Sequence, residues 1–272
     1  MHPFFNIFGL QISAFATMAV VAGVVAFVML LVSVRGSDLK HHAINYFFIA
    51  LCGALVGAWL LYALVNLPRL LVLWPQIRET MPLNEALTMA VRLLGGAVFY
   101  GGLLGGLLAM WLYARVYKTP LLPYLDIFAP IVAVAHAIGR VGCFLAGCCY
   151  GREMPSSHLL AVVYPPASLA APYGVTLLAV PLMEAGLNLL IAAGLIALMK
   201  LRGNKIKPGA VAALYMMLYA TTRFALEFFR GDAVRGGLWV LSTSQWISVG
   251  LFVAGVALLV YGHNTNLQSK QY

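Results

Sequence analysis

The sequence contains very little charge. Only 9% of its 272 residues are charged, whereas 62% are hydrophobic, and the mean hydropathy is +0.92. Soluble domains carry about 25% charged residues, so this scarcity excludes an ordinary soluble protein. Lys and Arg are absent before residue 35, whereas a cleavable signal peptide needs a basic segment before a short apolar core. The sequence therefore predicts an all-α, multi-pass membrane protein whose first apolar stretch is an uncleaved transmembrane helix.

Acidic residues are the scarcest charged class. Eight Asp and Glu stand against 17 Lys and Arg, which gives a formal net charge of +9. Such an excess can indicate nucleic-acid binding, but no basic run with interleaved aromatic residues is present. In a membrane protein, Lys and Arg more often anchor cytoplasmic loops. We therefore expect no nucleic-acid partner.

Apolar windows of roughly 20 residues, separated by charged or Pro- and Gly-rich breaks, predict about seven transmembrane helices. The loops at 35–43, 115–122 and 200–208 lie on one side and, with the C-terminal tail, hold nine Lys and Arg. The loops on the other side hold six. The richer side includes the dense cluster at 200–207, so we expect the N-terminus outside and the C-terminus in the cytoplasm. The expected spans are about 10–34, 44–66, 94–116, 123–148, 177–200, 209–230 and 244–262.

One long connection differs from an ordinary loop. Residues 67–93 mix Leu, Trp and Met with Arg and Glu, a composition typical of short amphipathic helices at the membrane surface. A plain extracytoplasmic loop is the alternative. Because no internal repeat or soluble domain is visible, residues 1–272 are expected to form a single integral membrane domain with an interfacial arm at 67–93.

Ionisable residues at membrane depth are the candidates for function. Charges in hydrocarbon are costly unless they meet a partner or a water-filled cavity. His136 stands four residues before Arg140, which places the two on one helix face. Arg223 and Glu227 have the same spacing. The Arg223–Glu227 pair has a purely structural alternative, because it could simply hold helices together. The candidates are Asp126, His136, Arg140, Glu184, Arg223 and Glu227.

Arg140 is the strongest of these candidates. No acidic residue lies within four positions of it, so it needs a partner from another span or an anionic ligand. The planar guanidinium offers a fork of donors that suits phosphate. A lipid phosphate is therefore a plausible occupant.

Glycines gather in the third predicted span, where residues 94–106 hold three Gly-Gly pairs. Small residues at helical spacing let helix backbones approach closely, which explains most of them. Alternatively, Gly101 and Gly102 directly after Tyr100 open room for a lipid headgroup.

The chain has only four cysteines, and three of them, Cys143, Cys148 and Cys149, cluster at the end of the fourth span. Inert small side chains, a disulfide and a reactive thiol all remain open. A zinc site prefers four ligands in a recognised spacing, which is not present, so neither a metal nor another cofactor is expected.

Four blocks together resemble the prolipoprotein diacylglyceryl transferase family over about residues 94–250. This resemblance implies seven spans with the N-terminus outside, in the bacterial plasma (inner) membrane. It also implies that a diacylglyceryl group moves from phosphatidylglycerol to a cysteine thiol of a lipoprotein precursor, with release of glycerol phosphate. The blocks are GRVGCFLAGCCYGR at 139–152, FYGGLLG at 99–105, PLMEA at 181–185, and RFALEFFRGD at 223–232 followed by Ser244-Gln245-Trp246.

The resemblance also implies roles for individual residues. Arg140 would bind the lipid phosphate and stabilise the leaving group, and Arg223 would complete the anion clamp. Glu227 or Tyr100 would handle the proton. Gly151 would allow a tight turn beside the lipid. The implied substrate-binding residues are Gly101, Gly102, Cys143, Cys148, Gly151, Glu184, Arg230 and Gln245.

Several positions depart from the family pattern. Cys143 stands where the family usually has Asn, Cys148 where it has an acidic residue, and Tyr100 where it has His. A related headgroup transfer with a cysteine as nucleophile or acceptor is therefore one alternative. A lipid-binding or transport protein without catalysis is another.

Overall fold

The computed structural model describes residues 3–7, 10–96, 98–231 and 237–268. The protein is a mostly helical, multi-pass membrane protein, as predicted. Among the described residues, six helices are long and apolar enough to cross a membrane. They are α1 (Ala14–Ser33), α2 (Lys40–Thr80), α4 (Phe99–Tyr117), α5 (Leu121–Ala146), α6 (Val180–Arg202) and α8 (Thr243–Gln268).

The seventh predicted span coincides with α7 (Ala210–Glu227), which is not one of these six. That α7 crosses the membrane stays a prediction, as does the orientation of the N-terminus. The chain divides into two compact units, Met1–Ser33 with Leu122–Tyr272, and Val34–Leu121.

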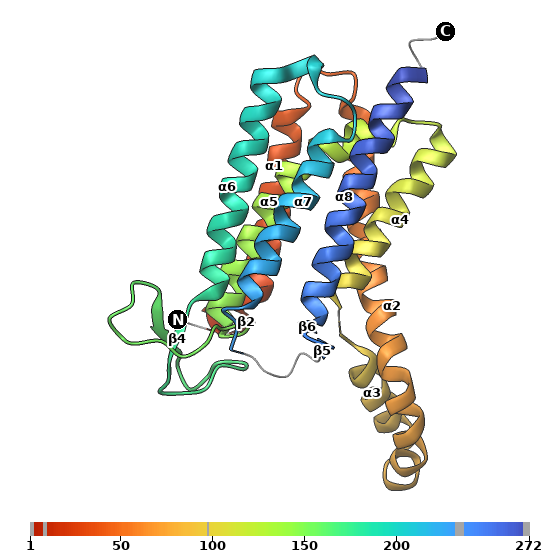
Figure 1. Ribbon diagram of the computed structural model, residues 1–272. Helices are drawn as coiled ribbons and strands as arrows, with labels where there is room; N and C mark the ends of the chain where they lie inside the picture. Colours follow the sequence, from red (N-terminus) through yellow and green to blue (C-terminus); the bar gives the residue numbers. More distant parts are fainter. Residues whose placement is uncertain (1–2, 8–9, 97, 232–236, 269–272) are drawn as a thin grey trace. The chain divides into compact units, whose positions relative to one another are not determined.

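The first unit contains α1, α5, α6, α7 and α8. Successive helices alternate in direction, so that the connection between α6 and α7 lies at the end opposite to β4, β5 and β6 (Figure 1). Three antiparallel two-stranded sheets accompany these helices, and a short 3-10 turn, η1 (Gly203–Lys205), follows α6. The strand pairs are β1 (Phe4–Ile7) with β2 (Leu10–Ser13), β3 (Ala161–Val163) with β4 (Thr176–Leu178), and β5 (Gly237–Leu238) with β6 (Leu241–Ser242).

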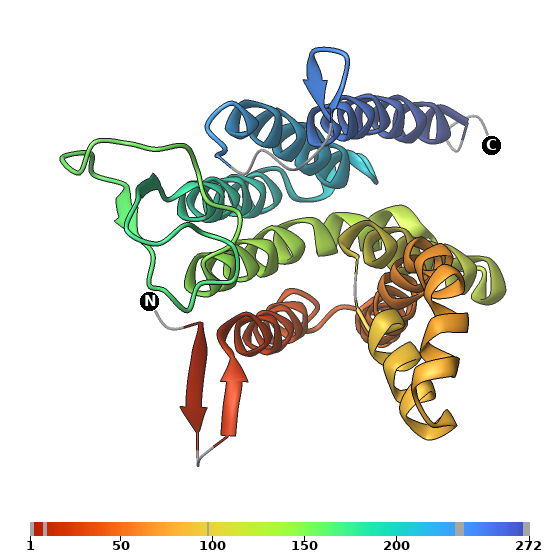
Figure 2. The same cartoon turned by 90° about the horizontal axis from the view of Figure 1, so that it is seen from below.

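The first of these hairpins shortens the first predicted span. Residues 10–13 form strand β2, which pairs with β1 in a register that sets Phe4 opposite Ser13. Figure 2 shows the two strands side by side ahead of α1. The helix therefore begins at Ala14, because the backbone groups of residues 10–13 are engaged by the neighbouring strand.

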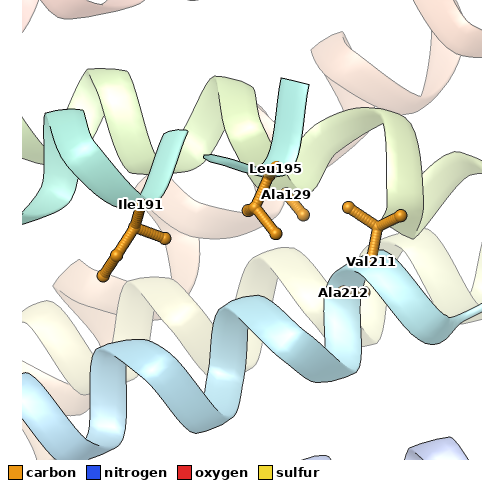
Figure 3. Packing of buried hydrophobic residues seen from close by; sticks show 5 residues of the cluster. All are labelled: Ala129, Ile191, Leu195, Val211 and Ala212. Atoms are coloured by element: carbon orange, nitrogen blue, oxygen red, sulfur yellow. The ribbon is translucent and has the colours of Figure 1, made fainter. Parts of the chain in front are cut away.

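The apolar core of this unit lies where α5, α6 and α7 meet (Figure 3). Leu195 is completely buried and Val211 is nearly so, and both project into the space that the three helices share. Partly buried side chains such as Leu125 and Leu258 close the cluster. Its central members are Ala129, Ile191, Leu195, Val211 and Ala212.

Asp126 is a structural residue of this unit. Its carboxylate, buried on α5, accepts hydrogen bonds from the backbone N–H groups of Gly209 (2.6 Å) and Ala212 (2.9 Å). The first turn of a helix has unsatisfied N–H groups, and a carboxylate there also complements the helix dipole. Asp126 therefore caps α7 from a neighbouring helix, at the end of the unit where α6 is joined to α7.

The second unit pairs α2 with α4 through glycine. A Cβ on Gly101 would clash with the carbonyl oxygen of Gly57, and one on Gly105 would clash with that of Gly53. This contact allows the two helix backbones to pack directly against each other. The packing explanation for the glycines of the third predicted span is therefore the one that the structure supports.

The same unit contains the predicted interfacial arm. α2 has 41 residues, or about 60 Å at 1.5 Å per residue, roughly twice the hydrocarbon thickness. Residues 67–80 continue α2 through Pro68 and Pro75 instead of forming a separate short helix. The following α3 (Leu83–Leu94) is amphipathic, with Leu87 and Val91 on one side and Glu85 and Arg92 on another. Its place at the membrane surface stays a prediction.

Candidate active site

An ion pair between α5 and α6 forms the centre of the site. The Arg140 guanidinium lies 2.9 Å from Oε1 of Glu184, and its Nε donates to Nε2 of His136, four residues earlier on α5, at 3.3 Å. Glu184 is almost completely buried, whereas the side chain of Arg140 keeps 17% of its surface exposed. The partner that Arg140 requires thus comes from another helix, and Arg140 still reaches the surface of the unit.

Tyr219 joins this centre from α7. Its hydroxyl donates to Oε1 of Glu184 at 3.4 Å, and its ring centroid lies 4.9 Å from that of His136. Oε2 of Glu184 is buried without a hydrogen-bond partner among the described residues. Tyr219 was not predicted from the sequence, although it precedes Arg223 by four residues and so shares a face of α7 with it.

A second ion pair lies at the C-terminal end of α7. One Nη of Arg223 is 2.8 Å from Oε2 of Glu227 and also donates to Oγ of Ser244 at 3.0 Å. The other guanidinium nitrogen, Nη1, is buried without a hydrogen-bond partner within the described part of the chain. Buried donors are nearly always satisfied, so an unused N–H of Arg223 is a place where an anion could bind.

Ser242 holds Glu227 in position. Its hydroxyl donates to Oε1 of Glu227 at 2.8 Å and accepts the backbone N–H of Gln245 at 3.2 Å. The side chain of Gln245 in turn accepts the N–H of Ser242 at 2.9 Å. This reciprocal pair is a capping box at the start of α8, and the pattern Ser-x-x-Gln is its sequence signal. Gln245, predicted to bind substrate, has this structural role here.

The charges of the two pairs are balanced at one end of the unit. Arg140 and Arg223 stand against Glu184 and Glu227, and both guanidinium groups lie within electrostatic reach of His136. The site is therefore neutral overall, and an anion that enters it has to be held by particular N–H groups, such as the unused Nη1 of Arg223.

Of the three clustered cysteines, Cys143 lies in the last turn of α5, and Cys148 and Cys149 follow the end of this helix. The N–H of Cys148 bonds to the carbonyl of Cys143 at 3.1 Å, and that of Gly147 bonds to the carbonyl of Phe144 at 3.2 Å. With Gly147 in the left-handed region (φ 69°), these bonds form a Schellman motif, which brings its first and last residues together. Cys143 and Cys148 occupy those two positions.

Cys149 completes the cluster and also has a left-handed backbone (φ 62°). Hydrogen bonds with Cys143 and Cys148, and then the nearby Arg230 guanidinium, lower the pKa of the Cys149 thiol, although its burial acts in the opposite direction. Hydrogen bonds with Cys143 and Cys149 raise the pKa of the Cys148 thiol. None of the four cysteines, all of them within the described residues, forms a disulfide.

Gly151 allows chain segments to cross. Its N–H bonds to the carbonyl of Leu178 at 2.9 Å, and it pairs with Arg230 in an isolated bridge. A Cβ at Gly151 would lie 2.6 Å from a methyl group of Val180. The glycine is therefore required for close approach, and the left-handed residues of this segment are Gly147 and Cys149.

The remaining predicted site residues, Tyr100, Gly101 and Gly102, belong to the second unit. Tyr100 is partly exposed and packs edge-to-face against Phe99. Gly102 lies 3.3 Å, measured from its would-be Cβ, from the carbonyl oxygen of Ala54. Both glycines thus contribute to the packing of α4 on α2, and a role for them in lipid binding stays a prediction.

Comparison with known proteins gives this site a context. A family model described as prolipoprotein diacylglyceryl transferase matches residues 3–261 of the chain. The match includes every residue of the two ion pairs and of the turn at Cys143–Cys149, called the cysteine turn below.

Individual relatives agree with the family model. The chain is 31% identical over 255 residues to the phosphatidylglycerol–prolipoprotein diacylglyceryl transferase of Clostridium tetani. This match covers 93% of this chain and 94% of the relative. It is 39% identical over 163 residues to phosphatidylglycerol–prolipoprotein diacylglyceryl transferase 2 of Clostridium perfringens. This match covers 60% of this chain and 61% of the relative. It is 37% identical over 168 residues to the Aromatoleum aromaticum protein, covering 61% of each.

Proposed function

Because the chain belongs to the prolipoprotein diacylglyceryl transferase family, we propose that it transfers the diacylglyceryl group of phosphatidylglycerol to a cysteine thiol of a lipoprotein precursor. The names of its relatives give phosphatidylglycerol as the donor and a prolipoprotein as the acceptor. The proposed location is the bacterial plasma membrane, with the N-terminus and the active site on the outer side. No cofactor takes part in the proposed reaction.

The reaction is a displacement at carbon. The acceptor thiolate attacks the carbon of the diacylglyceryl group that carries the phosphate ester, a C–S bond forms, and the bond from this carbon to the phosphate oxygen breaks. The electron pair leaves with the phosphate oxygen, so that glycerol phosphate is the second product, and the thiol proton passes to a base. Negative charge therefore grows on the leaving group, which is where the protein has to supply positive charge.

The observation that carries this proposal is the pair of guanidinium groups at one end of the first unit. Arg140 is fixed by Glu184 and His136 yet keeps part of its surface exposed. Arg223 has a buried Nη1 without a hydrogen-bond partner among the described residues. We assign the phosphate of the lipid to these two groups. Bidentate binding by arginine would hold the ester oxygen in place as the C–O bond breaks.

Glu227 is the proposed proton acceptor. Its Oε2 forms the ion pair with Arg223 at 2.8 Å, but it accepts no hydrogen bond of good geometry among the described residues. Ser242 fixes the other carboxylate oxygen, so Oε2 keeps a constant position and a lone pair for the thiol proton. Tyr100 remains the second candidate for this role.

Four other residues act indirectly in this proposal. Glu184 orients Arg140, and Gln245 fixes the start of α8 next to Glu227. Gly151 lets the lipid-facing loop approach α6, and Arg230 adds positive charge beside the cysteine turn. Cys143 and Cys148 remain proposed contacts of the lipid, and Gly101 and Gly102 remain proposed contacts of its headgroup.

A transfer assay tests the proposal. Purified protein in detergent receives phosphatidylglycerol and a peptide with a lipoprotein-type cysteine. We expect a peptide that has gained one diacylglyceryl group and an equal amount of free glycerol phosphate. Arg140→Gln should lower kcat by about 10²–10³-fold, the typical cost of losing one donor to developing negative charge. Arg152→Gln, which removes an exposed arginine stacked on Phe229, is the matched control and should keep the activity.

Two outcomes would overturn the proposal. One is no turnover by the wild-type protein under conditions in which the Clostridium tetani relative is active. The other is loss of transfer in the Cys143→Ser or Cys148→Ser variant, with the diacylglyceryl group found on the same cysteine in the wild-type protein, because this would identify a thiol of the chain as the nucleophile. Retained activity in both variants supports direct transfer to the peptide.

A further inference from the structure

Three thiols converge beside the proposed lipid site, and none of them takes part in the bond changes of the proposed transfer. The Sγ atoms of Cys143, Cys148 and Cys149 all lie within 4.8 Å of one another, and the three residues are partly buried. The thiol of Cys148 also contacts the carbonyl oxygen of Cys143 at 3.5 Å. Three of the four cysteines of the chain are thus collected at one point.

The backbone holds this convergence in place. The Schellman motif at the end of α5 sets Cys143 beside Cys148, and the left-handed conformation of Cys149 turns the third thiol toward them. A later segment then bonds to the turn, because the N–H of Leu169 donates to the carbonyl of Ala146 (3.0 Å) and that of Ala171 to the carbonyl of Gly147 (2.9 Å). Non-glycine residues rarely adopt positive φ, and such strain concentrates at functional sites.

We propose that Cys143, Cys148 and Cys149 form a three-thiolate site for a thiophilic metal cation of the Zn²⁺, Cd²⁺ or Cu⁺ type. Thiolate sulfurs bound to Zn²⁺ at about 2.3 Å lie about 3.8 Å from one another. The thiols need to move together by no more than about 1 Å from their present separations to reach that geometry. Three protein ligands leave one coordination position for water or another small ligand.

The chemistry of the donors selects this class of cation. Sulfur donors favour soft or borderline metals, whereas Mg²⁺ and Ca²⁺ require oxygen ligands. Three thiolates and a divalent cation together carry one negative charge, and the guanidinium of Arg230, which hydrogen-bonds to Cys149, lies beside them to balance it. The spacing Cys-x4-Cys-Cys alone does not indicate a metal site, because the proximity of the thiols arises from the two left-handed residues.

A titration with Cd²⁺ alone tests this site in the full-length protein, purified without reductant. We expect a sulfur-to-cadmium charge-transfer absorption that saturates at one Cd²⁺ per chain. Replacing any one of the three cysteines by serine should weaken binding by more than the ~10–100-fold that the loss of an outer-shell partner costs. Cys52→Ser, at an exposed position in α2, removes the same chemical group and should leave the titration unchanged.

A second measurement needs no substitution. Zn²⁺ should protect Cys143, Cys148 and Cys149, but not Cys52, from alkylation, and a chelator should restore their reaction, as read by mass spectrometry of peptides. Equal titrations for the wild type and the three cysteine variants would overturn the proposal. So would a disulfide between Cys143 and Cys148 in the purified protein, which would show that the turn serves as a covalent link.

Discussion

Arg140 has both a structural and a chemical role, and the Arg140–Glu184 pair allows the two to be separated. Arg140→Gln leaves Glu184 buried without its countercharge, which should destabilise the protein by about 3–5 kcal/mol. The double variant Arg140→Gln/Glu184→Gln replaces the ion pair by two neutral amides and should recover most of that loss. We expect diacylglyceryl transfer to remain absent in the double variant, because no guanidinium is left to bind the phosphate.

Thermal unfolding in detergent and the transfer assay, applied to the same samples, check this prediction. Recovery of activity together with stability in the double variant would contradict the role of Arg140 at the phosphate. It would reduce the pair to a link between α5 and α6.

The role of Glu227 as the base can be tested by comparing its variants with those of Ser242, whose hydroxyl bonds to it. If Oε2 accepts the thiol proton, Glu227→Gln should lower kcat by about 10²–10⁴-fold, the usual contribution of a general base. Ser242→Ala removes only the hydrogen bond that positions the carboxylate, so its effect on kcat should be much smaller. Steady-state kinetics over a range of pH distinguish the two, because only the loss of a base removes the fall in rate at low pH. An unchanged pH profile in Glu227→Gln would assign the proton to another group.

Many of the individual site residues could be predicted from the sequence, because a charged residue in an apolar span is costly and therefore indicates a function. Arg140, Glu184, Arg223 and Glu227 were all named, and the structure pairs them. The sequence could not show which acid meets which arginine, since that depends on helix packing. It also missed Tyr219, because a tyrosine in an apolar span carries no such signal.

Among the helices, α7 depends on a cap that another helix supplies. Asp126→Ala leaves the N–H groups of Gly209 and Ala212 without their acceptor. We expect the free energy of unfolding to fall by about 1–3 kcal/mol, with transfer per folded molecule unchanged, because Asp126 lies at the opposite end of the unit from the two ion pairs. Asp38→Ala, in an exposed loop, is the control. A large loss of kcat at full stability would instead assign Asp126 to the reaction.

The contact between α2 and α4 has an equally direct test. Gly101→Ala places a methyl group against the carbonyl oxygen of Gly57, and overpacking of this kind costs about 1–3 kcal/mol. Gly194→Ala on α6, where a Cβ meets open space, should be neutral or raise stability by up to ~1 kcal/mol. Thermal unfolding of both variants checks this. If Gly101→Ala keeps its stability but loses transfer, the glycine serves the lipid headgroup and not the packing.

Long apolar runs were sufficient to predict the helices, because a span in lipid has to satisfy its own backbone hydrogen bonds. Their ends were less predictable. α2 continues through Pro68 and Pro75, two residues that usually end helices, and the hairpin before Ala14 lies within a run that is apolar enough for a helix. The cysteine turn was also beyond prediction, since its shape is set by the left-handed backbone at Gly147 and Cys149.

For the whole molecule, the helix directions within the first unit bring the functional residues together. The C-terminal ends of α5 and α7 lie with the N-terminal ends of α6 and α8, so that segments up to about 100 residues apart share one end. The family assignment agrees with the resemblance found in the sequence. The predicted orientation, with Lys200–Lys207 in the cytoplasm, would place this end at the outer surface.

The most direct test of this account is an experimental structure of the protein with bound phosphatidylglycerol. The account predicts density for the lipid phosphate within hydrogen-bonding distance of both Arg140 and Nη1 of Arg223, with Glu227 facing the ester carbon. A phosphate bound elsewhere, with Arg140 still engaged only by Glu184 and His136, would contradict it.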